Sequence, residues 1–303
     1  MDSTTKTRWL AKLAKLRLDR AKGNPAPHKP LLLLVVIDLA ERGELPENVL
    51  PLTPELAFRF CSYWHIVAYR RTQAPDVTYP FYHLQSEGCW EATGEDGQLA
   101  PDRRLARFAE LDPDFEACLN DADFREPARR LLICRYFPKN EWPGLCTILG
   151  IPDLNEAEAV SALKHQSAEE ASQKGREARF RLQIVPSYNY ACALTGYRIL
   201  TVSSSSLIDA AHIHQFSDSR NNDVRNGIAL CRNAHWQFDN GLWTIADDFT
   251  VLVAHDRFTE ESPDQKPLSA YHGQKLRLPT DSALYPDPVH LAWHRRKWFR
   301  GGA

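Results

Sequence analysis

A run of apolar residues, LLLLVVIDLA at positions 31–40, is the feature that most constrains this fold. Pro30 suits the first turn of a helix, and Gly43 suits the position just after its end. Because a helix that is apolar nearly all round must be covered on every side, we expect this one at the centre of a domain. Asp38 interrupts the run, which is shorter than the ~18 apolar residues of a membrane span. We therefore expect no membrane partner.

The composition is that of an ordinary globular protein, with 303 residues, 43% of them hydrophobic and 25% charged. The formal net charge of −2 gives no general positive field. Both ends are locally basic, which indicates either anionic partners or two solvated helix faces. The seven cysteines form no CxxC pair, which argues against a disulfide framework and a four-cysteine zinc site. With no apolar stretch of a signal peptide near the N-terminus, we expect a cytoplasmic protein.

The pattern of polar and apolar residues predicts an α+β fold in two domains. The stretch over 151–175 is polar, acidic and almost free of aromatic residues, so we expect a linker or an exposed helix there. It separates a mostly helical domain at 1–150 from a second domain at 176–303. In the first domain we expect a basic amphipathic helix over 4–22, a helix over 54–70, a strand-like segment over 77–93 and helices over 102–136. Pro80 should keep the strand-like segment at an edge or a bulge.

The second domain is expected to begin with a helix and a turn and to continue with short strands. We expect a strand at Leu207–His212, a polar loop at Ser217–Arg225, and strands near Leu242–Ile245 and Val251–Ala254. Three aromatic residues are expected in its core: Trp236, Phe238 and Trp243.

Four residues stand at informative spacing in this domain. Asn226 follows His212 by fourteen residues, His235 follows nine later, and Asp239 four after that. Residues at i and i+4 share one helix face, so His235 and Asp239 can hold one ion. A strand, a loop and a helix together could place His212, Asn226 and His235 around one point.

The segments DAAHI, RNGIALC and HWQFDNGL, preceded by CALTG, resemble the HNH nuclease family over roughly residues 176–254. The resemblance implies a ββα-metal unit that hydrolyses phosphodiesters with an activated water. In that unit His212 is the general base, and Asn226 holds backbone or imidazole in position. His235 and Asp239 bind a divalent ion. One carboxylate among nitrogen ligands suits Mg²⁺, Mn²⁺ or Co²⁺ better than a closed zinc site.

Two features depart from the family pattern. Ala211 stands where many members have a metal-binding Asp or His. Asp209 lies two residues before Ala211, about 7 Å away along the strand. It could bind the metal ion directly, bind it through a water molecule, or not bind it at all. Many members also carry two CxxC pairs, whereas this chain has only Cys192 and Cys231 here, so we predict no structural zinc.

Simpler roles are open for the same side chains. His212 could be a hydrogen-bonded core histidine, and Asn226 and Asp239 could be turn residues. His214, on the same strand face as His212, is expected to be a supporting neighbour or a phosphate contact.

In the first domain, APHKPLLLL and TYPFYHL resemble the sulfur-binding domain of modification-dependent (type IV) restriction endonucleases. The resemblance spans roughly residues 1–150 and implies binding of double-stranded DNA whose backbone carries a phosphorothioate. It places the HK pair on a phosphate-binding loop and the YP pair in an apolar cup for sulfur. An apolar cup disfavours oxygen, because a buried oxygen without donors keeps its desolvation cost. The candidate contact residues are Arg20, Ala26, Pro27, His28, Lys29, Tyr79, Pro80 and a base-reading arginine, Arg104 or its neighbours Arg103 and Arg107.

Both resemblances together predict a restriction endonuclease that acts on phosphorothioated duplex DNA. Since one HNH site cuts one strand, we also expect a homodimer. Two alternatives stay open: an HNH nuclease specific for another modification or for unmodified DNA, and a DNA-binding regulator that has lost catalysis. A loop and a buried helix without any ligand would also explain APHKPLLLL.

Overall fold

The computed structural model describes residues 3–19, 25–70, 74–154, 162–202 and 206–299. The chain divides into two compact units. Unit 1 comprises Met1–Arg179 with Thr201–Ser205, and unit 2 comprises Phe180–Leu200 with Ser206–Ala303. Helix α8 (Ala162–Ser187) starts within the stretch expected to be a linker or an exposed helix. The mixture of helices and small sheets confirms the predicted α+β class. No helix among the described residues is both long and apolar enough to cross a membrane.

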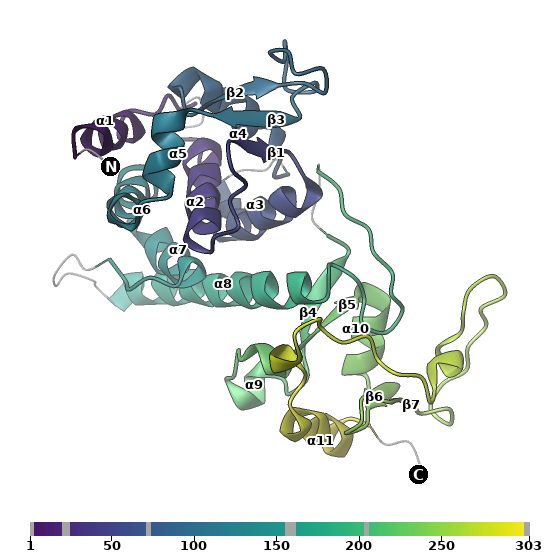
Figure 1. The fold of residues 1–303 in the computed structure, drawn as a ribbon. Helices are drawn as coiled ribbons and strands as arrows, with labels where there is room; N and C mark the ends of the chain where they lie inside the picture. The colour runs from purple at the N-terminus through teal and green to yellow at the C-terminus, as the bar shows by residue number, and fades with distance from the viewer. Residues whose placement is uncertain (1–2, 20–24, 71–73, 155–161, 203–205, 300–303) are drawn as a thin grey trace. The chain divides into compact units, whose positions relative to one another are not determined.

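Helix α2 (His28–Glu41) is the centre of unit 1. Every residue from Pro30 to Leu39 is buried, including Asp38, whose carboxylate pairs with Arg42 at 3.1 Å. The helix packs against α3 (Pro54–Val67), α4 (Thr78–His83) and α6 (Ala122–Tyr136) (Figure 1). The remaining helices of the unit are α1 (Ser3–Leu13), α5 (Pro113–Leu119) and α7 (Trp142–Leu149). The expectation of a fully covered central helix is confirmed.

A three-stranded antiparallel sheet in the order β1-β3-β2 completes unit 1. Its strands are β1 (Val49–Pro51), β2 (Trp90–Thr93) and β3 (Phe108–Leu111). The prediction of helices throughout 102–136 is therefore wrong at its start. The sequence FAEL alternates exposed and buried residues, the period of a strand, and β3 pairs on both sides. Helix begins only at Pro113, where the Asp112 carboxylate accepts the N–H of Phe115.

The strand-like segment predicted over 77–93 is helical along most of its length. Helix α4 and a 3₁₀ turn occupy Thr78–Glu87, and strand β2 starts only at Trp90. Asp76 accepts the backbone N–H of Thr78, which starts the helix. Pro80 stands in the first turn, where a missing N–H costs no helical hydrogen bond. The proline is thus a helix-start signal here and not a strand-edge signal.

The basic N-terminal helix is shorter than the predicted span of 4–22. It ends at Leu13, whose carbonyl accepts the Tyr136 hydroxyl at 2.7 Å, while the N–H of Leu16 donates to the same hydroxyl at 2.8 Å. A side chain more than a hundred residues away therefore ends this helix. Residues 20–22 lie outside the described residues.

Unit 2 is built on a β-hairpin followed by a helix. Strand β4 (Ile208–His212) pairs antiparallel with β5 (Gly227–Cys231), and α10 (Arg232–Asp239) follows directly. The expected polar loop between the strands contains a short helix, α9 (Phe216–Ser219). A second hairpin joins β6 (Trp243–Ile245) to β7 (Val251–Val253), as predicted. Helix α11 (Pro288–Lys297) packs against β6 and places His294 on the Phe238 ring, with ring centroids 3.7 Å apart.

Candidate functional site

His212 ends strand β4 in a fixed orientation. Its ring stacks on Phe180 from α8, with centroids 4.0 Å apart and planes 4° apart. Its Nε2 lies 2.8 Å from the Asn222 side-chain oxygen. Opposite His212 on β5 is Gly227, where an added Cβ would lie 2.4 Å from Ile184 of α8. The glycine therefore permits the close approach of α8 that brings Phe180 under the imidazole.

The Asn222 contact also assigns the proton of the imidazole. An amide oxygen only accepts, so in this arrangement Nε2 donates and Nδ1 of His212 carries the lone pair. Asn222 was not predicted from the sequence. It stands in a polar loop, where no spacing rule separates one asparagine from its neighbours.

Asn226 is fully buried and binds backbone on both sides. Its side-chain oxygen accepts the N–H of His214 at 2.8 Å, and its amide donates to the carbonyls of His214 at 2.9 Å and Asn221 at 3.0 Å. These bonds tie the exit of β4 to the entrance of β5. The side chain is suited to hold the loop that carries Asn222, and not to react.

His235 and Asp239 lie one turn apart on α10, with Nε2 and Oδ2 3.4 Å apart. Burial raises the pKa of the Asp239 carboxyl, and the nearby His235 and His212 oppose that rise. His212 is near enough to influence the pKa of Asp239, and we call these three side chains the histidine–aspartate cluster. It combines a base with two potential metal ligands.

Asp209 is engaged elsewhere. Its carboxylate accepts Nε of Arg181 at 3.0 Å and its neighbour's backbone N–H at 3.0 Å. Arg181 is held further by the Ile208 carbonyl at 3.1 Å. Ala211 is fully buried and offers no ligand atom. The structure therefore brings two of the three predicted metal ligands together and leaves Asp209 in an ion pair.

His235 and Asp239 fit a hydrated divalent ion. Within the described parts of the chain, no group of three or more His, Cys, Asp or Glu side chains is placed so that it could hold a metal ion by itself. Mg²⁺ keeps several water ligands and often binds through one or two protein groups and substrate phosphates. The half-buried Asp239 carboxylate lies beside His235, and burial raises its pKa, so a bound cation would favour its charged form.

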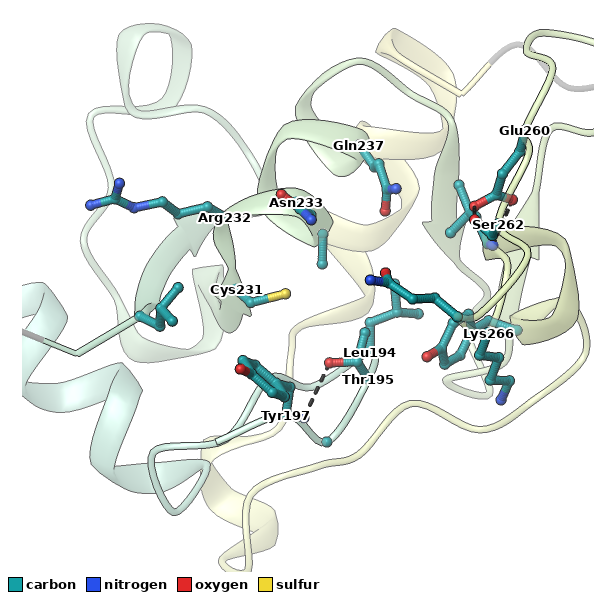
Figure 2. A pocket seen from close by; sticks show the side chains of 16 residues that line it. Leu194, Thr195, Tyr197, Cys231, Arg232, Asn233, Gln237, Glu260, Ser262 and Lys266 are labelled. Carbon is teal, nitrogen blue, oxygen red and sulfur yellow. Dashed lines mark hydrogen bonds between the residues drawn. The ribbon is translucent and has the colours of Figure 1, made fainter. Parts of the chain in front are cut away.

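Cys192 and Cys231 contact each other instead of lying apart. The contact with Cys231 lowers the pKa of the Cys192 thiol; Thr195 assists and burial opposes. The Cys231 pKa is raised by the same contact. Cys231 and Thr195 also line a cavity of about 800 Å³ on one side of α10 (Figure 2). The absence of a structural zinc stays a prediction.

In unit 1, five of the predicted contact residues line one pocket of about 480 Å³. They are Ala26, His28, Lys29, Tyr79 and Pro80. The α2 start supplies the HK pair and α4 supplies the YP pair, so the packing of α2 on α4 forms the pocket. Lys29 pairs with Glu87 and lies 3.3 Å from the Ser86 hydroxyl. We call this site the YP pocket.

Other predicted contact residues lie elsewhere. Pro27 is buried at the start of α2 and does not line the YP pocket. Arg104 is exposed and also outside its lining. Arg20 lies outside the described residues.

Two residues that the sequence analysis missed or left undecided lie at the YP pocket. Arg103 places its guanidinium 3.8 Å above the Tyr79 ring and pairs with Asp76 at 2.7 Å. His83 lines the pocket, and burial, with the nearby Lys29 and Arg103 charges, lowers its pKa. The i,i+4 spacing from Tyr79 could have indicated His83 if the segment had been recognised as a helix.

One comparison with known proteins falls on unit 2. Residues 192–246 match the model of the HNH endonuclease family. A solved structure of a modification-dependent TagI restriction endonuclease is similar at 15% identity and a TM-score of 0.31, over 71% of this chain and 52% of that one. This chain thus spans about half the length of that protein. No curated protein matches. The matched residues 192–246 contain the β4–β5 hairpin, helix α10 and the histidine–aspartate cluster, so this part of the chain is similar to an HNH endonuclease.

Proposed function

We propose that this protein is a modification-dependent (type IV) restriction endonuclease. Unit 1 binds duplex DNA that carries a backbone phosphorothioate, and unit 2 hydrolyses phosphodiesters nearby with a divalent metal ion. The observation that carries the nuclease assignment is the histidine–aspartate cluster inside an HNH domain, with its base held by Phe180 and Asn222. We place the protein in the cytoplasm. A double-strand break needs a cut in each strand, which a homodimer or two binding events would supply, and we favour the homodimer.

In the proposed reaction, His212 accepts a proton from the attacking water. Because Nε2 is hydrogen-bonded to Asn222, the proton goes to Nδ1, and the imidazolium that forms still donates to the amide oxygen. Asn226 keeps the Asn222 loop in place through its backbone bonds. His235 and Asp239 would hold Mg²⁺, Mn²⁺ or Co²⁺, which stabilises the charge that develops on the phosphate.

The YP pocket suits a group with a soft, weakly hydrogen-bonding atom and one negative charge. Tyr79, Pro80 and Ala26 supply ring and methyl surface, and His28 and Lys29 supply donors. Replacing a non-bridging oxygen with sulfur keeps the charge of the phosphate but weakens its hydrogen bonding. Apolar surface against that atom disfavours oxygen, which would lose its water without gaining a donor.

The test is digestion of one plasmid prepared with and without backbone sulfur, in the presence of Mg²⁺ or Mn²⁺. We expect nicking of the sulfur-containing plasmid and little of the other. Equal cutting and equal affinity for both would show a nuclease of another specificity. The absence of a third protein ligand among the described residues favours one rival, a regulator. Metal-independent binding without any cleavage would identify it.

A further inference from the structure

Trp236 is the most exposed aromatic side chain of unit 2 among the described residues, with 63% of its surface open to solvent. The expectation that it belongs to the core is wrong, whereas Phe238 and Trp243 are buried as predicted. Ala234 and Phe238 fill the inner face of α10, each about 1% exposed. The fold therefore does not need the Trp236 indole for packing, and tryptophan is among the side chains enriched at interfaces.

The indole lies beside the histidine–aspartate cluster on the surface of α10. At about 100° per residue, Trp236 is roughly 100° around the helix from His235 and about 60° from Asp239. Arg232 and Asn240 lie one turn before and one turn after Trp236. The Asn240 amide donates to the Trp236 carbonyl at 2.8 Å. A cation, an indole and an amide thus form a row along the helix next to the cluster.

The opposite side of α10 has a different role. Asn233 and Gln237 point into the cavity of about 800 Å³, whereas the Arg232 guanidinium extends away from it (Figure 2). Trp236 does not line that cavity. Trp236 therefore faces the solvent beside the cluster and is not part of the cavity wall, whereas Arg232 borders the cavity with its guanidinium turned outward.

We propose that Trp236 stacks on a nucleobase that adjoins the cleaved phosphate. This inference rests on the proposed nuclease function, because a phosphate held at the cluster brings its own flanking bases to within reach of the indole. Aromatic side chains stack on bases of any sequence and can wedge into a base step of a duplex. The positive charge of Arg232, one turn away, suits the neighbouring phosphates of the same strand. DNA is therefore the partner of this face.

The experiment measures cleavage kinetics on a duplex whose cut site has been mapped with the wild-type protein. Trp236→Ala should raise KM by roughly 10-fold, within the about 5- to 140-fold span of base stacking, and change kcat less. Trp236→Phe should keep most of the affinity, since it keeps an aromatic face. Tyr197→Ala is the matched control, because Tyr197 is 50% exposed and lines the cavity on the other side of α10. It should leave KM unchanged.

Removal of the base tests stacking directly. When an abasic nucleotide replaces the stacked neighbour of the cut, the KM penalty of Trp236→Ala should fall to less than about twofold. A penalty that persists with an abasic nucleotide on either side of the cut would overturn base stacking. A wild-type KM for Trp236→Ala would overturn the inference and leave the nuclease proposal intact. No cleavage of any DNA by the wild-type protein would overturn both.

Discussion

The YP pocket and the histidine–aspartate cluster differ in how their charged side chains are paired. At the pocket two cations are already paired, Lys29 in its lining with Glu87 and the adjoining Arg103 with Asp76. In the cluster the His235 imidazole lies beside one half-buried carboxylate, Asp239, whose pKa burial raises. Fixed ion pairs hold a surface in shape for a ligand, whereas histidines exchange protons near neutral pH. Under the proposed function unit 1 recognises and unit 2 reacts, and the three predictions below test that division.

The largest expected effect is that of His212→Ala. Loss of a positioned general base should slow cleavage by about 10²- to 10⁴-fold. Binding of modified DNA should stay at the wild-type level if recognition belongs to the YP pocket. Single-turnover nicking and gel-shift titration of the same duplex measure the two effects separately.

The matched control is His214→Ala. This imidazole stacks on Trp293 at 3.9 Å, and burial, with the nearby His290, lowers its pKa. We expect its removal to reduce cleavage far less than His212→Ala does. Equal losses for both variants, or a loss of binding with His212→Ala, would contradict the division between recognition and reaction.

The next largest expected effect is a loss of stability at acidic pH caused by a buried histidine, His294. Burial lowers the pKa of His294 to about 4, where its ring lies between Phe238 and the Thr244 hydroxyl. The folded state therefore binds this proton less readily than the unfolded chain, whose histidines titrate near ~6.5. The associated stability is fully present above that pH and is lost as pH falls toward 4, by roughly 3 kcal/mol in total.

Urea unfolding of unit 2 at pH 7 and pH 4.5 measures this loss. The wild-type protein should lose stability between these values, and His294→Gln should lose less because it has no proton to bind. The same slope in both proteins would show that other groups govern the acid response. The comparison would also separate a histidine that packs from His212, which reacts.

The sequence alone predicts those features of the fold and the site that depend on a local pattern of residues. The i,i+4 spacing of His235 and Asp239 fixes one face of α10 before any tertiary contact is known. The apolar run of α2 can only be a covered helix. The HK and YP pairs were grouped by resemblance, and the structure brings them to one pocket.

The remaining features depend on contacts between residues distant in the chain. Phe180 reaches the His212 ring across 32 positions, and Arg181 takes up Asp209 across 28. Neither partner has a spacing that marks it in the sequence. The aromatic residues of Thr78–Glu87 favour a strand, and the sequence therefore predicts one. The structure instead has a helix there, preceded by Asp76, whose carboxylate accepts the N–H of Thr78. Tertiary packing thus decides both the errors in secondary structure and the orientation of the base.

The smallest expected effect concerns the selectivity of the YP pocket. Tyr79 is 45% exposed, and its ring lies between the pocket and the Arg103 guanidinium. Tyr79→Ala should lower the preference for phosphorothioate over phosphate by about 10-fold, the order of one lost apolar contact of ~1.4 kcal/mol. Tyr79→Phe should retain the preference, because it keeps the ring.

The ratio of the two affinities is the informative quantity. Cations bind both backbones alike, so weakening of electrostatic contacts lowers both affinities and leaves the ratio unchanged. Tyr82→Ala is the control, since its hydroxyl binds the Pro101 carbonyl at 3.0 Å and its ring does not line the pocket. A ratio that falls with Tyr79→Ala alone would assign sulfur recognition to the ring. An unchanged ratio with weaker binding to both backbones would make the YP pocket a general phosphate site, and the selectivity would then have to come from another part of unit 1.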